Sequence, residues 1–223
     1  GMDGKEIEIM SQWFDLCYTT KIDLESATTM GKEIADAYSS PQRSYHTLEH
    51  ISHCFSVLDR VPVAIEKETE LRFAIWFHDF IYEPKSESSE NESAQIAYRW
   101  LSNLKICDSK HVQNLILSTA NYLEPAKDQL SYQVLHDIDL AILASEQDLY
   151  LEYQKGIRQE YEHLSDEQFF LGRGQFLNSL LKLNPIFSIQ AFEHQWEEKA
   201  RQNISNELKK IEKVVNLVPP IEK

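Results

Sequence analysis

The chain is poor in cysteine, glycine and proline. Its 223 residues include only three cysteines, Cys17, Cys54 and Cys107, and no two of them have C-x-x-C spacing. Disulfide frameworks and thiolate zinc sites need paired cysteines, so neither is indicated, and buried thiols in a reducing compartment are expected. Six glycines and seven prolines are few for a turn-rich all-β protein, which disfavours that class.

Positive charge and long apolar runs are also scarce. Lys and Arg total 22 against 36 Asp and Glu, a formal net charge of −14. Duplex nucleic acid and anionic membranes both attract clustered cations, so neither is expected as a partner. Apolar runs such as residues 73–77 are far shorter than the roughly 20 residues of a membrane span. The polar start, residues 1–5, lacks the apolar core of a signal peptide, and a cytoplasmic location is expected.

Apolar residues make up 42% of the chain and recur mostly every three or four positions, the period of an amphipathic helix. Strand-like alternation is rare, so the pattern predicts an all-α helical bundle, and the length favours one domain over residues 1–223. Helix N-termini are predicted at Ser89 with Glu92, at Asp108, and at Ser165 with Gln168. The expected helices are one around Trp13 and then 24–38, 45–58, 66–82, 89–104, 108–122, 129–143, 145–163, 165–183 and 188–217.

Histidines and acids stand in three apolar segments. His46 and His50 are four residues apart, so on a helix they share one face. A His-Asp dipeptide lies within the apolar stretch 73–82, and His136 to Asp139 lie within another, 134–143. Each alone has a structural explanation, such as a hydrogen-bonded core histidine or a capped aspartate. Together they are best explained by one shared divalent cation, because buried carboxylates need a partner of opposite charge.

The donor types narrow the choice of metal. Imidazole nitrogens and carboxylate oxygens without thiolate suit Mn, Fe, Co, Ni, Zn or Mg in a site open to water. Such an ion lowers the pKa of bound water and neutralises phosphoryl charge. Hydrolysis of esters, and of phosphoesters above all, is therefore the indicated chemistry.

The order of these motifs resembles the HD superfamily of metal-dependent phosphohydrolases, and within it a bacterial branch described as predicted HD-superfamily phosphohydrolases. The resemblance covers roughly residues 38 to 212. Its main motifs are Arg43-x-Tyr45-His46-x3-His50, Phe77-His78-Asp79-x2-Tyr82, Asn91-Glu92-Ser93-Ala94 and Asp137-x-Asp139-Leu140.

The resemblance implies the ligand set. His50, His78 and Asp79 would bind the metal, and Asp137 and Asp139 compete to be the fourth ligand. Asp139 is preferred, because Asp-Leu after a short apolar helix is the usual setting of this ligand in HD proteins. Asp137 would then lie behind the ligands or face solvent. One ion per chain is expected, held in a core of about residues 38–145, with C-terminal helices of about 146–217 packing on it.

The resemblance also suggests catalytic and substrate-binding residues. The Tyr45-His46-x3-His50 piece is similar to the cyclic nucleotide phosphodiesterases, which makes His46 a general acid. Asp79 or Asp139 would orient the attacking water. Glu92 either activates a water or holds a metal-bound one, or caps its helix with Ser89. Three arginines that could bind phosphate are Arg43, Arg158 and Arg173, although Arg158 could equally pair with Glu162.

The expected function is hydrolysis of a small phosphorylated molecule, with a nucleotide the first choice. An HD-type module that senses a nucleotide or a metal without turnover is the alternative. Oxygen chemistry, as in some di-iron HD proteins, would need a second ion. The aromatic-rich final third fits a core or a homodimer interface, and the oligomeric state stays open.

Overall fold

The computed structural model describes residues 3–124 and 129–215, and within these ranges it contains ten α-helices, one 3-10 helix and no strand. The prediction of an all-α fold is therefore confirmed. The chain divides into two compact units, Gly1–Ile138 and Asp139–Lys223. The expectation of one domain, with residues 146–217 packing on a core of 38–145, remains a prediction.

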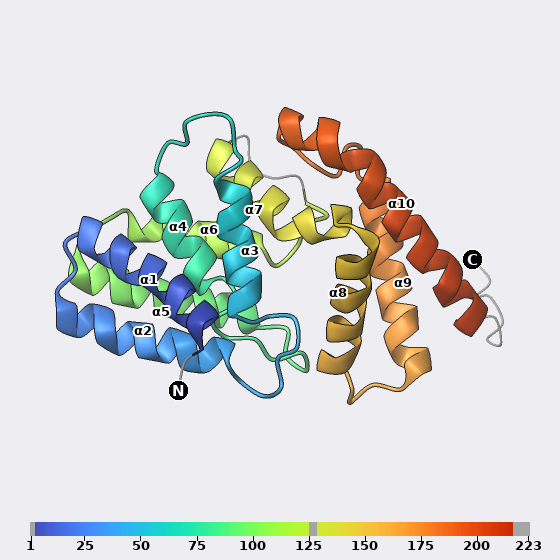
Figure 1. Cartoon of the computed structure of the whole chain (residues 1–223), viewed down its shortest axis with the longest axis horizontal. Helices are drawn as coiled ribbons and strands as arrows, with labels where there is room; N and C mark the ends of the chain where they lie inside the picture. The colour runs from blue at the N-terminus through green and yellow to red at the C-terminus, as the bar shows by residue number, and fades with distance from the viewer. Residues whose placement is uncertain (1–2, 125–128, 216–223) are drawn as a thin grey trace. The chain divides into compact units, whose positions relative to one another are not determined.

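The first unit holds the motifs of interest (Figure 1). The boundary between the two units falls inside one continuous helix, α7. Nine of the eleven residues of α7 belong to the first unit, so the helix is described with that unit. The helices are α1 (Gly4–Thr19), α2 (Leu24–Tyr38), α3 (Leu48–Leu58), α4 (Glu68–Phe77), α5 (Ser89–Leu104), α6 (Ser109–Ser118) and α7 (Leu130–Leu140).

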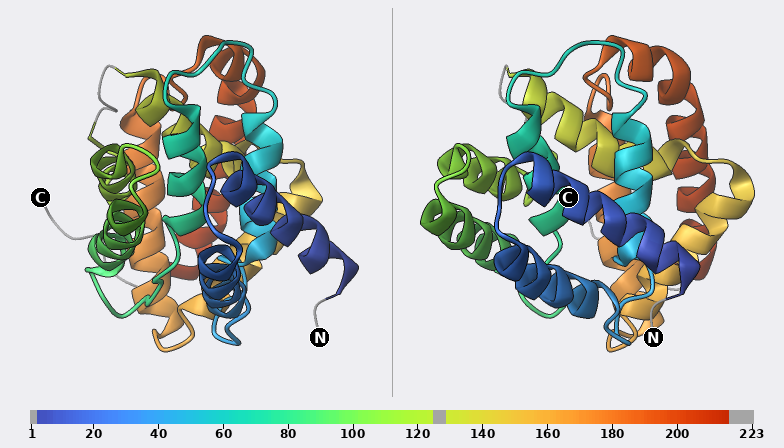
Figure 2. Two further views of the ribbon diagram at one scale, coloured as in Figure 1. Left: turned by 90° about the vertical axis from the view of Figure 1, so that its left-hand side faces the viewer. Right: turned by 60° about the vertical axis from the view of Figure 1, so that its left-hand side comes forward.

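Helix α4 lies at the centre of this unit and packs on α1, α3, α5 and α6, as the two views of Figure 2 also show. Residues 73–77 of α4 are all fully buried. The Trp13 ring of α1 meets Phe73, Trp76 and Phe77 edge to face, with ring centroids 5.6–6.0 Å apart. Its Nε1–H donates to the carbonyl of Ala27 on α2. Burial of these aromatic rings is a large apolar contribution to the unit, because each removes about 150–250 Å² from water.

Several helices are shorter than predicted. Helix α3 begins at Leu48 rather than residue 45, α4 ends at Phe77 rather than 82, and α6 ends at Ser118 rather than 122. After α4 the main chain bonds to other elements: Ile81 N–H donates to the Ser93 hydroxyl, which in turn donates to Ile81 O. These contacts replace the next helical turn. One expected helix end, Leu217, lies outside the described residues.

The predicted caps are partly confirmed. Asp108 accepts a hydrogen bond from the first turn of α6, and Ser165 with Gln168 forms a full capping box. The predicted box of Ser89 with Glu92 is wrong. The N-cap of α5 is Ser88, and the Ser89 hydroxyl accepts from the Glu83 N–H instead.

The second unit comprises η1 (Ala141–Ala144), α8 (Gln147–Glu160), α9 (Asp166–Lys182) and α10 (Gln190–Val215). A buried ion pair joins α9 to α10, with Arg173 Nε 2.9 Å from Glu207 Oε2. Tyr153 of α8 accepts a hydrogen bond from Arg173, and Tyr150 donates to Glu207. Each charge is thus paired and hydrogen-bonded, the condition under which a buried ion pair is tolerated.

Among the described residues, no helix is both long enough and apolar enough to cross a membrane.

Candidate metal centre

Two histidines meet from neighbouring helices. His50 belongs to the buried face of α3, and His78 is the C-cap residue of α4; their exposed fractions are 4% and 2%. Their Nε2 atoms are 3.3 Å apart. The contact between α3 and α4 therefore places two imidazole nitrogens at one point inside the unit.

The Asp79 carboxylate joins them from the turn that follows α4. Its Oδ2 lies 3.3 Å from His50 Nε2 and 3.0 Å from His78 Nε2. Although these distances are short, this buried oxygen satisfies no hydrogen-bond geometry. A buried oxygen in that state is costly unless a cation neutralises it.

The tautomer of His78 is set by the main chain. Its Nδ1 lies 2.7 Å from the Ile75 carbonyl oxygen, and because a carbonyl only accepts, Nδ1 must carry the proton. Neutral His78 then presents the lone pair of Nε2 toward Asp79. A backbone carbonyl on the far ring nitrogen is the usual arrangement for a metal-binding histidine.

The local field keeps Asp79 ionised. Burial raises the pKa of its carboxyl, but the nearby His78 and His46 outweigh burial and hold that pKa well below its usual value. That lowering operates while the two imidazoles are protonated; where His78 is neutral, a bound cation would take the place of their positive charge beside the ionised carboxylate.

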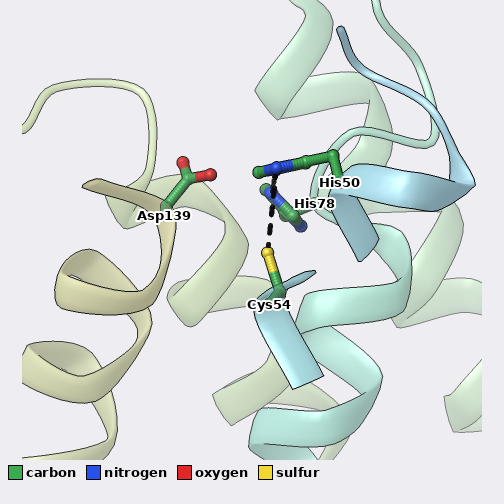
Figure 3. Close-up of side chains that lie close together, drawn as sticks. All are labelled: His50, Cys54, His78 and Asp139. Atoms are coloured by element: carbon green, nitrogen blue, oxygen red, sulfur yellow. Dashed lines mark hydrogen bonds between the residues drawn. The ribbon is translucent and has the colours of Figure 1, made fainter. Parts of the chain in front are cut away.

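Two further side chains reach the same point (Figure 3). Each of His50, Cys54, His78 and Asp139 has a ligand atom within 4.8 Å of those of the other three, and the Asp139 carboxylate points toward the histidines. Of the two competing acids, only Asp139 belongs to this group. Asp137 is completely buried, so the alternative that it faces solvent is wrong.

The distances fit a metal ion. Bond lengths of about 2.0–2.2 Å to nitrogen and oxygen imply donor separations of roughly 2.9 Å at octahedral and roughly 3.3 Å at tetrahedral angles. The three separations among His50, His78 and Asp79 run from 3.0 to 3.3 Å. The residues present therefore match a transition-metal or magnesium site in both donor type and spacing.

Cys54 belongs to this cluster as well, although no sequence motif predicted it. The residue is 1% exposed, as a small buried hydrophobic group would be, but its Sγ lies 3.7 Å from His50 Nε2. The available signal was its spacing, since residues four apart on a helix share a face.

His46 lies beside the cluster rather than on the same helix. Because α3 begins after it, the prediction that His46 and His50 share a helical face is wrong. Its ring stacks on Tyr82 at 4.1 Å, and its centroid is 5.8 Å from that of His50. The loop before α3 and the turn after α4 thus hold His46 at the edge of the site.

Arg43 binds main-chain oxygens. Its guanidinium donates to the carbonyls of Asp79 at 2.7 Å, Phe80 at 2.8 Å and His46 at 3.3 Å. These bonds tie the loop that carries His46 to the turn that carries Asp79. A cavity of about 690 Å³ borders Arg43, and the residues that line it do not include His50, His78 or Asp79.

The remaining predicted residues have other partners. Glu92 is exposed on α5 and accepts a hydrogen bond from Ser88. Arg158 pairs with Asp166, not with Glu162, and also donates to two carbonyls. Arg173 is part of the buried ion pair of the second unit. Their roles with substrate stay predictions.

No family model, no curated protein and no solved structure matches this chain. The family resemblance therefore stands on the motifs alone, and the case for function stands on the geometry of the cluster.

Proposed function

We propose that the protein is a metal-dependent phosphohydrolase of the HD type. Its substrate would be a small phosphorylated molecule, with a nucleotide the first choice. The observation that carries the proposal is the convergence of His50 Nε2, His78 Nε2 and Asp79 Oδ2 within 3.3 Å of one another. The Asp139 carboxylate lies within 4.8 Å of the ligand atoms of the two histidines.

In this proposal His50, His78, Asp79 and Asp139 hold one divalent ion, which is Mn, Fe, Co, Ni, Zn or Mg. Such an ion supplies Lewis acidity, lowering the pKa of a bound water and offsetting the charge of a phosphoryl group. That offset matters here because the chain itself carries a net charge of −14.

The chain's own groups would move the protons. His46 stands at the edge of the cluster, held by its stack on Tyr82, and would act as the general acid that protonates the leaving oxygen. The second oxygen of Asp79 would accept a hydrogen bond from the attacking water and orient it. The three cysteines are free, which agrees with a reducing compartment, and we propose the cytoplasm.

Metal analysis of protein purified without chelator, followed by a phosphate-release screen over nucleotides and phosphate esters, tests the proposal. The wild type should carry about one divalent ion per chain. Asp79→Asn should lose most of that ion and lower turnover by roughly a hundredfold or more, as expected when a metal-site group is removed. Asp59→Asn, an exposed change at the end of α3, should behave as the wild type.

Protein free of divalent metal and inactive toward every substrate would contradict the proposal. Tight nucleotide binding without turnover under any metal would favour the non-catalytic sensing module instead. Two ions per chain would bring oxygen chemistry back into consideration.

A further inference from the structure

The main-chain hydrogen bonds change at the end of α4, where two of the proposed ligands stand. In an α-helix each N–H donates to the carbonyl four residues earlier. Phe80 N–H would then donate to Trp76 O, but it donates to Phe77 O at 3.0 Å. The Trp76 carbonyl is thus left for another donor. The chain leaves the helix here, with His78 at the C-cap and Asp79 in the turn that follows.

The Tyr38 hydroxyl takes the place of the missing helical bond. Tyr38 is the last residue of α2 and is 1% exposed, and its hydroxyl donates to Trp76 O at 2.6 Å. The main-chain N–H of Asp79 lies within hydrogen-bond reach of the same hydroxyl oxygen. A phenolic hydroxyl can donate and accept at once. One oxygen therefore joins the last turn of α4 to the main chain of Asp79.

The same hydroxyl bears on the tautomer of His78. A continuing helix would bring Asp79 N–H to Ile75 O. With that N–H at the Tyr38 oxygen, Ile75 O accepts the Nδ1–H of His78 at 2.7 Å. This bond leaves the Nε2 lone pair of His78 toward His50 and Asp79, which is the orientation that a metal ligand needs.

Arg43 restrains the other side of the Asp79 main chain. Its guanidinium carbon lies 5.1 Å from the centroid of the Tyr38 ring, and the guanidinium donates to the Asp79 carbonyl at 2.7 Å. Tyr38 therefore approaches the N–H of Asp79, while Arg43 binds its C=O. Because both main-chain groups are restrained, the carboxylate keeps its place 3.0–3.3 Å from the Nε2 atoms of the two histidines.

We propose that the Tyr38 hydroxyl is a positioning group for the metal centre, which holds the Asp79 main chain and fixes the tautomer of His78. Its effect on metal binding rests on the proposed metal centre, whereas its effect on the two side chains rests on hydrogen bonds alone. The aromatic ring is not needed for this role, so removal of the oxygen by itself should disturb both residues.

Tyr38→Phe tests the proposal, because it removes the hydroxyl and keeps the ring. The matched control is Tyr150→Phe, which removes a buried hydroxyl bonded to Glu207 in the second unit. Both variants are compared with the wild type without metal. Amide hydrogen exchange reports on Asp79, and the nitrogen NMR spectrum reports on His78 at a pH of about 8.5, where an ordinary histidine is neutral. Wild type and control should show a protected amide and a single Nδ1–H tautomer, and Tyr38→Phe should lose both.

Metal affinity supplies the second measurement. Isothermal titration with Zn²⁺ should show that Tyr38→Phe binds the ion roughly tenfold more weakly, as expected when a group that supports a metal ligand is lost. Tyr150→Phe also loses a buried hydrogen bond, but it should keep the wild-type affinity. A general loss of stability would weaken both variants, so the difference between them isolates the positioning effect.

The outcomes separate this inference from the proposed function. Wild-type Zn²⁺ affinity in Tyr38→Phe, with unchanged exchange of Asp79 and an unchanged tautomer of His78, overturns the positioning role and leaves the metal centre standing. A wild type that binds no metal contradicts the proposed function, whereas the metal-free spectra still decide the role of Tyr38. A freely exchanging Asp79 amide or an Nε2–H tautomer of His78 in the wild type overturns the inference, even if Tyr38→Phe does not fold.

Discussion

Arg43 is the residue that connects the two sides of the candidate metal centre. Its guanidinium is shared among the carbonyls of His46, Asp79 and Phe80 and lies over the ring of Tyr38 at 5.1 Å. The planar guanidinium group has several N–H donors in fixed positions and can donate to three oxygens at once. The ammonium group of a lysine cannot make the same three hydrogen bonds. Arg43 is therefore a positioning residue for Asp79 and His46.

Arg43→Lys should weaken metal binding although the residue does not touch the ligand atoms. The lysine cannot make all the hydrogen bonds of Arg43 to the turn after α4, so this turn is held less firmly. We expect the metal affinity to fall by about tenfold, as for other groups that support metal ligands. Isothermal titration with Zn²⁺ or Mn²⁺ measures this directly. Arg99→Lys, an exposed change on α5, should leave the affinity unchanged.

The same variant distinguishes the role first expected for Arg43, which was binding of phosphate. A raised KM with unchanged metal affinity would indicate lost substrate contact instead of lost positioning. The motif spacing pointed to Arg43 as important, but only the folded chain shows which oxygens it binds.

At the scale of single residues, the sequence predicted His50, His78, Asp79 and Asp139 through motif order and the cost of burying unpaired acids. It missed Cys54, because a cysteine buried beside the cluster and one buried elsewhere in the core have the same local pattern. It misplaced His46, since α3 begins only at Leu48, with Thr47 as its N-cap.

At the scale of helices, the packing of α1 on α2 depends on a glycine. A Cβ built on Gly31 would lie 2.9 Å from Trp13 Nε1 and 3.0 Å from its Cδ1. Trp13 is fully buried and bonded to Ala27, so it has no room to move away. Gly31 therefore allows α2 to lie close to the Trp13 ring of α1, although glycine has a low helix propensity.

Gly31→Ala should destabilise the protein, while Gly172→Ala should stabilise it. Overpacking at Gly31 should lower the free energy of unfolding by about 1–3 kcal/mol, more than the gain of roughly 1 kcal/mol in helix propensity. Gly172 is exposed within α9, and nothing lies within 4 Å of an added Cβ, so its substitution should add about 0.5–1 kcal/mol. Urea denaturation of both variants measures the change in the free energy of unfolding. A stabilised Gly31→Ala variant would refute the close packing.

Helix positions were well predicted, and helix ends were predicted correctly only where local signals set them. The predicted range 24–38 coincides with α2, whose N-cap Asp23 binds Ser26 N, a purely local signal. Residues 78–82 continue the apolar pattern of α4, but Ser93 and Arg43 bind their main-chain groups. The spacing of apolar residues contains no information about such distant partners, so the predicted helix was longer than the observed one.

At the scale of the whole molecule, a bound cation should stabilise the folded chain. A ligand that binds only the native state adds about 2.7 kcal/mol at a hundredfold excess over its dissociation constant. The ligands come from α3, from the C-cap of α4 and the turn after it, and from α7. These segments are separate in sequence, so the unfolded chain cannot hold the ion equally well.

Removal of metal should therefore lower the Tm, and its return should restore it. For a chain of this size the expected rise is roughly 5–10 °C at saturating metal, measured by calorimetry with and without chelator. Asp79→Asn should show little response to metal. An equal rise in Asp79→Asn would argue against the proposed centre.

The sequence by itself determined that the chain is helical, where most helices lie, and that histidines and acids are set into apolar segments. These properties follow from periodicity, capping residues and the cost of burying charge, all of which act over a few residues. Only the tertiary structure decided that α4 stops before His78, that Arg43 binds main-chain oxygens, and that Cys54 reaches the same point as the histidines. Those outcomes depend on contacts between residues tens of positions apart, and their distances follow from the packing of α3 and α4.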